Sequence, residues 1–263
     1  MAVSDLPPVE RLRSAILYCN QIHTRKPEYT VVRDDRRAFV HLIGVLLRVR
    51  RFAQASTLLD KRGFGPEARV LVRAAIEHAV TAQYAYLVVG GLDEFISSVA
   101  SDRISLTELI ASHSRSEELS TQAEAFRAER DADLSSGNFT RARLPGFTGE
   151  NSIVALLDNA AFLVQTYRVL SQDAHVTHSA TYNALMQDGD EIVIQLDPPD
   201  DIAHQTLYAL TSASLLAAWV VAHIEHDDLA LRTIRAWGNE LHMPWRLDGH
   251  LSADRRRFPD ETE

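Results

Sequence analysis

A chain of 263 residues with 46% hydrophobic and 24% charged residues has the balance of a globular protein and can bury a substantial core. Its longest apolar run, residues 215–224, is shorter than the roughly 18 residues of a bilayer span, and no secretory signal is visible, so we expect a cytoplasmic protein with no membrane helix. The net charge of −9 makes the chain acidic as a whole, and a single cysteine, Cys19, excludes an internal disulfide and a thiolate zinc site within one chain.

Apolar residues recur at helical spacing through most of the chain, and alternation of β-branched residues is nearly absent. The sequence therefore predicts an all-α helical bundle of about seven helices, with a single helical domain over residues 1–250. The predicted helices cover residues 8–24, 34–61, 66–89, 91–113, 115–131, 151–186 with a break, and 199–242 with a break near His226 and Asp227.

Turn residues divide these helices. Gly63, Gly65 and Pro66 predict a tight helical hairpin between the second and third helices. Residues 132–150 hold three Gly and one Pro without periodicity, which predicts a mobile loop, and Asn151 is expected to cap the next helix. The pair Asp188-Gly189 precedes a strand-like run and predicts a small β-hairpin near residues 186–196. Residues 251–263 are expected to form a flexible tail.

Positive charge is concentrated in the first 80 residues, which carry 14 Lys and Arg against 8 Asp and Glu, a net +6, whereas the rest of the chain sums to −15. Such a basic face could track phosphates, or it could be a set of solvated helix faces. Most of the excess comes from Arg33, Arg36, Arg37, Arg48, Arg50, Arg51, Lys61 and Arg62.

The predicted helix that begins near Ile153 is the most informative region for function. The spacing of a buried face is followed by Ile153, Leu157, Ala160, Val164 and Tyr167. The same spacing continues into polar residues, namely Ser171, His175, His178 and Tyr182, with Arg168 beside them. A polar group buried without a partner costs about 1–3 kcal/mol, so we expect these side chains to line a cleft or to bond one another in an internal network.

A second polar insertion lies on the predicted third helix, where Arg73 and Glu77 are four residues apart within an apolar row. They could form a structural ion pair that fixes helix packing. In the other interpretation, Glu77 holds Arg73 for contact with a phosphate. Both residues are therefore candidates to line the cleft.

The segment Arg168-Val-Leu-Ser-Gln-Asp-Ala-His175 resembles the Arg-x(4–6)-His motif of the HEPN superfamily, helical-bundle proteins frequent in bacterial defence and toxin systems. The segment Val72-Arg-Ala-Ala-Ile-Glu77 also resembles uncharacterised bacterial helical proteins that we associate with HEPN-like folds. The resemblance implies a homodimeric, metal-independent endoribonuclease in which the ribose 2′-hydroxyl attacks the neighbouring phosphate. Arg168 would stabilise the phosphate and His175 would transfer protons. It also implies RNA as substrate and an antitoxin or other protein as partner.

Other chemistries have less support in the sequence. The pairs His175/His178 and His223/His226 have a spacing that could share a metal, but no Glu-x-x-His or His-Glu-x-x-His motif accompanies them, and the second pair is expected at a helix end. We expect no metal and no cofactor. Cys19 is expected to be packed rather than reactive. The alternative to a ribonuclease is a non-catalytic helical module that binds a protein partner or small ligand in the polar cleft.

Overall fold

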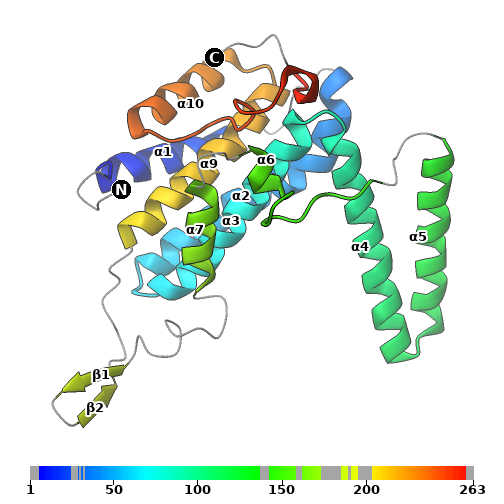
Figure 1. Ribbon diagram of the computed structural model, residues 1–263, viewed down its shortest axis with the longest axis horizontal. Coiled ribbons are helices and arrows are strands. Elements are labelled where there is room, and N and C mark those ends of the chain that lie inside the picture. The colour runs from blue at the N-terminus through cyan, green and yellow to red at the C-terminus, as the bar shows by residue number, and fades with distance from the viewer. Residues whose placement is uncertain are drawn as a thin grey trace. The chain divides into compact units, whose positions relative to one another are not determined.

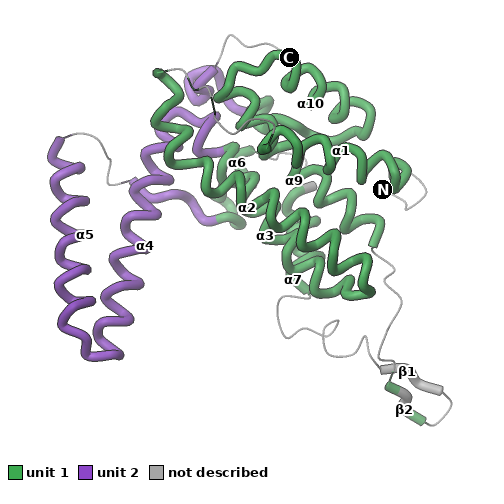
Figure 2. Tube along the Cα trace, turned by 180° about the vertical axis from the view of Figure 1, so that it is seen from behind, with its two compact units in different colours: residues 1–83, 147–250 green, residues 84–146, 251–263 purple. Residues whose placement is uncertain are grey.

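The computed structural model in Figure 1 describes residues 6–24, 29, 31, 33–136, 142–157, 162–172, 185–188, 191–194 and 203–258. Contacts divide the chain into two compact units (Figure 2). Unit 1 contains Met1–Gln83 and Phe147–His250, and unit 2 contains Tyr84–Gly146 and Leu251–Glu263. A compact unit is not by itself an independently folding domain, so the single domain expected over residues 1–250 stays a prediction.

The all-α fold class is confirmed. Unit 1 holds α1 (Val9–Ile22), the short 3-10 helix η2 (Arg33–Asp35), α2 (Arg36–Asp60), most of α3 (Gly65–Leu87), α6 (Ile153–Leu157), α7 (Phe162–Ser171), α9 (Ala203–Ile224) and α10 (Asp228–Leu241). Unit 2 holds the end of α3, α4 (Gly91–Ser114), α5 (Glu117–Ser135) and the 3-10 helix η3 (Ala253–Arg255). The break predicted near His226 and Asp227 is confirmed, because α9 ends at Ile224 and α10 begins at Asp228. The break predicted within residues 151–186 falls outside the described residues and stays a prediction.

The predicted β-hairpin is also confirmed. Strands β1 (Leu185–Asp188) and β2 (Glu191–Ile194) pair antiparallel, with Leu185 opposite Ile194 and Asp188 opposite Glu191. The pairing ends with Asp188 opposite Glu191, beside the Asp188-Gly189 signal that predicted the hairpin.

Helix α9 forms the centre of unit 1. It packs against α1, α2 and α10, and every residue from Tyr208 to Ile224 is buried. A helix that is apolar on all sides belongs in a core or in a membrane. Although α9 is long and apolar enough to cross a bilayer, 89% of its most apolar window is buried inside the fold, which is typical of a core helix.

Helices α2 and α3 form the hairpin that the glycines predicted. Gly63 has φ of 83°, a left-handed conformation that L residues with a side chain rarely adopt, and it reverses the chain between the two helices. The Phe52 ring of α2 meets the His78 ring of α3 edge-on, with centroids 5.3 Å apart. The buried face of α2 consists of Ala38, Leu42, Leu46, Val49, Ala53 and Ser56.

In unit 2, α4 and α5 form an antiparallel pair of helices (Figure 1). Gly91 starts α4, and a Cβ there would lie 2.6 Å from the carbonyl oxygen of Tyr84, so only glycine fits. The Arg127 guanidinium lies 2.5 Å from Glu108, and the Arg103 guanidinium lies 3.5 Å above the centre of the Phe126 ring. Helix α5 continues to Ser135, so the start of the loop predicted over 132–150 is helical instead.

The chain after residue 250 returns to the end of α3. The amide of Val89 donates to the Arg255 carbonyl at 3.0 Å, and the amide of Arg257 donates to the Leu87 carbonyl at 2.8 Å. The Tyr86 and Phe258 rings pack with centroids 5.4 Å apart. The start of the expected flexible tail is therefore tied by backbone hydrogen bonds, and flexibility of the segment 251–263 stays a prediction.

Candidate functional site

Helix α7 carries three residues of the predicted site, Tyr167, Arg168 and Ser171. Leu163 and Leu170 are buried, Val164 and Tyr167 are half-buried, and Arg168 is exposed. Seven residues separate the two buried leucines, which is two helical turns, so they hold one face of α7 against unit 1. Tyr167 lies at the edge of that face, whereas Arg168 points to solvent.

Arg73 of α3 and Tyr167 of α7 contact each other, although 94 residues separate them. Arg73 Nη2 donates to the Tyr167 hydroxyl at 2.5 Å, and the guanidinium carbon lies 4.7 Å from the centre of the Tyr167 ring. The Phe147 ring packs on the same tyrosine with centroids 4.7 Å apart. Arg73 Nε is buried and has no acceptor among the described residues. The two predicted cleft residues are therefore brought together, and Phe147, which the sequence placed in a loop, joins them.

The structural ion pair considered for Arg73 and Glu77 is wrong. Glu77 is half-buried one turn further along α3, and no ion pair joins it to Arg73 in the part of the chain that is described. The phenol of Tyr167 replaces it as the partner of Arg73. A tertiary contact has thus displaced the local i, i+4 pair, whose contribution on a helix surface is only about 0.2–0.5 kcal/mol.

Of the remaining predicted site residues, the structure describes Ser171 and Arg168. Ser171 donates its hydroxyl to the Tyr167 carbonyl at 2.6 Å, so it bonds its own helix. Arg168 forms no hydrogen bond or ion pair with any described residue. It is exposed, whereas the neighbouring Tyr167 is half-buried. His175, His178 and Tyr182 lie outside the described residues. The expectation that all these side chains share one recess therefore stays a prediction for the histidines.

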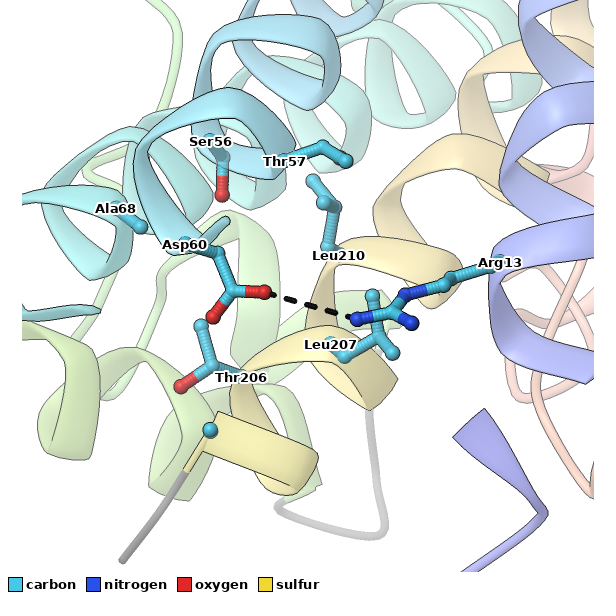
Figure 3. A pocket seen from close by; sticks show the side chains of 9 residues that line it. Arg13, Ser56, Thr57, Asp60, Ala68, Thr206, Leu207 and Leu210 are labelled. Atoms are coloured by element: carbon cyan, nitrogen blue, oxygen red, sulfur yellow. Dashed lines mark ion pairs between the residues drawn. The ribbon is translucent and has the colours of Figure 1, made fainter. Parts of the chain in front are cut away.

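A small cavity that the sequence did not indicate lies elsewhere in unit 1 (Figure 3). It has a volume of about 20 Å³, room for about one water molecule. Thr206, Leu207 and Leu210 of α9 line it together with Asp60 at the end of α2. Arg13, which also lines the cavity, lies 4.0 Å from Asp60 in an exposed and therefore weak ion pair. Its size excludes a substrate.

The pair His223 and His226 lies at the end of α9, as the sequence predicted. His223 is buried against Trp219 with ring centroids 4.7 Å apart, and His226 adopts φ of 53° just beyond the helix. His226 Nε2 lies 3.3 Å from Asp35 Oδ2. Within the described residues, no group of three or more His, Cys, Asp or Glu is placed to hold a metal ion.

Cys19 is packed, in agreement with the sequence. Its side chain is fully buried on α1, and burial raises the pKa of its thiol well above the ordinary value. A thiol is nucleophilic only as the thiolate, so this residue is inert at neutral pH.

Comparison with known protein families identifies the family of this chain. The model of a family of unknown function, DUF5677, matches residues 39–192, which is more than half of the chain. The matched range includes every predicted site residue from Arg73 to His178. No curated protein and no solved structure matches the chain significantly.

Proposed function

We propose that this chain, which belongs to the DUF5677 family of unknown function, is a HEPN-like endoribonuclease that cleaves RNA without a metal, with Arg168 and His175 as its catalytic residues. One observation supports the proposal most directly, namely the exposed Arg168 on α7, which has no partner among the described residues. An exposed guanidinium can bind a phosphate in bidentate fashion.

The contacts around Tyr167 explain how Arg168 would be held in place. Arg73 and Phe147 fix Tyr167 from two sides, and Leu163 and Leu170 fix the rest of α7. Arg168 is therefore presented from a packed helix rather than from a loop, although it is itself exposed. Positioning on a rigid element is what electrostatic stabilisation of a transition state requires.

In the proposed reaction, the ribose 2′-oxygen attacks the adjacent phosphorus and the P–O5′ bond breaks. His175 takes the proton of the 2′-hydroxyl, and the departing 5′-oxygen gains a proton from His175 of a second copy or from water. Arg168 stabilises the negative charge that develops on the non-bridging oxygens. The products are a 2′,3′-cyclic phosphate and a 5′-hydroxyl. The resemblance implies a homodimer, which we propose as the active form.

The test is cleavage of RNA in the presence of EDTA. Purified protein is expected to cut a single-stranded RNA into fragments with 2′,3′-cyclic ends, because no step needs a metal. His175→Ala is expected to lower the rate by about 10²–10⁴-fold, the usual contribution of general acid–base catalysis, and Arg168→Ala by about 10²–10³-fold. Arg232→Ala, which removes an exposed arginine from α10, serves as the matched control and should cleave normally. If the RNA stays intact at every tested length, the proposal that this protein is a ribonuclease is wrong.

A second candidate function has an observation of its own. The Arg73–Tyr167 contact is an internal polar interaction, which favours a non-catalytic module whose polar side chains bond one another around a binding site for a protein or small ligand. Under this alternative, His175→Ala would lower the free energy of unfolding by about 1–3 kcal/mol and there would be no activity to lose. A thermal melt of that variant beside the RNA assay separates the two functions.

Tyr167→Phe is expected to destabilise the protein by about 1–2 kcal/mol, because it removes the acceptor of a charged donor and keeps the ring that packs on Phe147. Urea denaturation measures the change. Ser171→Ala removes a hydroxyl from the same helix but only an intrahelical bond, and its effect should stay within about 0.5 kcal/mol. Equal effects of the two variants would contradict the role given to the Arg73–Tyr167 contact.

A further inference from the structure

The exposed face of α2 is strongly basic. Its 25 residues include five arginines, and no acidic residue occurs before Asp60 at its end. With 3.6 residues per turn, Arg37, His41, Arg48 and Arg51 fall within about 40° of one direction, on the side opposite the buried leucines. All four are exposed. This positive stripe lies within the basic first 80 residues of a chain whose net charge is −9.

The two arginines near the middle of α2, Arg48 and Arg51, could bind an anion. Arg48 and Arg51 make no ion pair or hydrogen bond with any residue that the structure describes. Partial desolvation and the neighbouring Arg37 lower the pKa of His41, so the positive charge of the stripe comes from its arginines. The exposed Gly44 between them has no atom near the position of a Cβ, which leaves the middle of the stripe open. No side chain therefore stands between His41 and Arg48 at the position of Gly44.

Two further cations lie in the turn between α2 and α3, after residues 52–60 of α2, which carry no positive charge. Lys61 and Arg62 are exposed there, and the Phe64 side chain is 52% exposed between two glycines. A half-exposed phenyl ring beside two cations is open to stacking with a base. The distance from Arg37 to Lys61 along the helix is about 36 Å, which spans roughly ten phosphates at about 3.4 Å per nucleotide.

From these observations we infer that the exposed face of α2 and the turn after it bind single-stranded nucleic acid. Arg48 and Arg51 would pair with backbone phosphates, and a base would stack on Phe64. A cationic track combined with an exposed aromatic ring is the arrangement by which proteins hold single strands without reading sequence. The inference names the binding track of the proposed ribonuclease, and it rests on that proposal in taking RNA as the ligand. Anionic membranes could also attract such a stripe, and the test includes them.

The test measures binding by fluorescence anisotropy with a labelled 20-nucleotide 2′-O-methyl-uridine strand. This probe keeps the phosphates and bases but lacks the 2′-hydroxyl nucleophile, so failure of binding and failure of cleavage are seen in separate experiments. A labelled oligo-deoxythymidine strand shows whether the track also accepts DNA. Vesicles of phosphatidylcholine and phosphatidylserine provide the membrane arm.

The double variant Arg48→Ala/Arg51→Ala is expected to weaken binding about 25-fold in 0.1 M salt and to lower the slope of log K against log salt by about 1.4, because each lost phosphate contact removes about 0.7 from that slope. Arg232→Ala/Arg235→Ala is the matched control, since it removes from α10 two exposed arginines that are also three residues apart. Phe64→Ala should weaken binding about tenfold with little change in the slope.

Three results would overturn the inference. The first is no binding of either strand by the wild-type protein at low salt. The second is an equal loss in the α2 and α10 double variants, which would reduce the effect to net charge. The third is binding to the vesicles but not to the strands. Loss of binding in the α2 variant alone supports the track even where cleavage of RNA is not detected.

Discussion

Asp248→Ala is expected to lower the free energy of unfolding by about 3–5 kcal/mol, because it leaves a buried arginine without its counter-charge. Asp248 Oδ1 and Oδ2 accept from Arg246 Nε and Nη2, both at 2.6 Å. The two side chains are only 8% and 4% exposed. The Arg246 guanidinium also lies 5.3 Å from the centre of the Trp219 ring, so it cannot move to water without leaving the core.

Urea denaturation of the variant measures this loss. Asp102→Ala on the exposed face of α4 is the matched control, and it should change stability by no more than about 0.5 kcal/mol. A further variant, Arg246→Met/Asp248→Leu, removes both charges and should recover much of the lost stability, since replacing a buried ion pair by apolar residues is often neutral. Equal losses in the single and double variants would show that packing, rather than an unpaired charge, dominates.

The helices could be predicted from the sequence because their signals are local. Helical periodicity, Gly63 at positive φ and Pro66 in the first turn of α3 all act within a few residues. The residue that caps α6 could not be predicted in this way. Asn151 was expected to cap it, whereas the hydroxyl of Ser152 accepts from the amide of Ala155 at 3.1 Å. Two adjacent residues with capping side chains cannot be separated by pattern alone.

The candidate site was less predictable because its contacts are long-range. Periodicity on α3 suggested Glu77 as the partner of Arg73, and the structure pairs Arg73 with Tyr167 instead. Nothing in the local sequence indicates which side chain arrives from a helix 94 residues away. Phe147 carried no signal either, since its segment has no periodicity. The sequence predicted that Arg168 lies on a helix but did not predict that its side chain is exposed.

Gln83 is a second buried position that the sequence did not single out, and its replacement should have a comparable effect on stability. Its side chain is fully buried, and its amide nitrogen donates to the carbonyls of Leu216 at 2.8 Å and Trp245 at 3.2 Å. Its carbonyl oxygen accepts from the amide of Leu247 at 3.3 Å. One side chain thus joins α3 to α9 and to the segment after α10.

Gln83→Leu is expected to cost about 3–5 kcal/mol, because each buried backbone group left without a partner costs about 1–3 kcal/mol and the segment at Trp245 and Leu247 has no helix to satisfy it. The cost at the Leu216 carbonyl is smaller, because this carbonyl lies within α9 and can accept a helical hydrogen bond. Chemical denaturation measures the loss. A change below about 1 kcal/mol would mean that water or a shifted backbone satisfies these groups.

Gln83→Glu tests the same contacts through pH. It keeps an oxygen for the Leu247 amide but faces the carbonyls of Leu216 and Trp245 with a carboxyl group. Only the protonated form can donate to a carbonyl, so burial and these acceptors should raise the pKa of the glutamate in the folded state. A group whose pKa is raised on folding stabilises the protein below its unfolded pKa, and that stability is lost as pH rises through the folded value. The deficit of Gln83→Glu relative to wild type should therefore be larger at pH 7.5 than at pH 5, and an equal deficit at both values would show that Gln83 does not act as the donor.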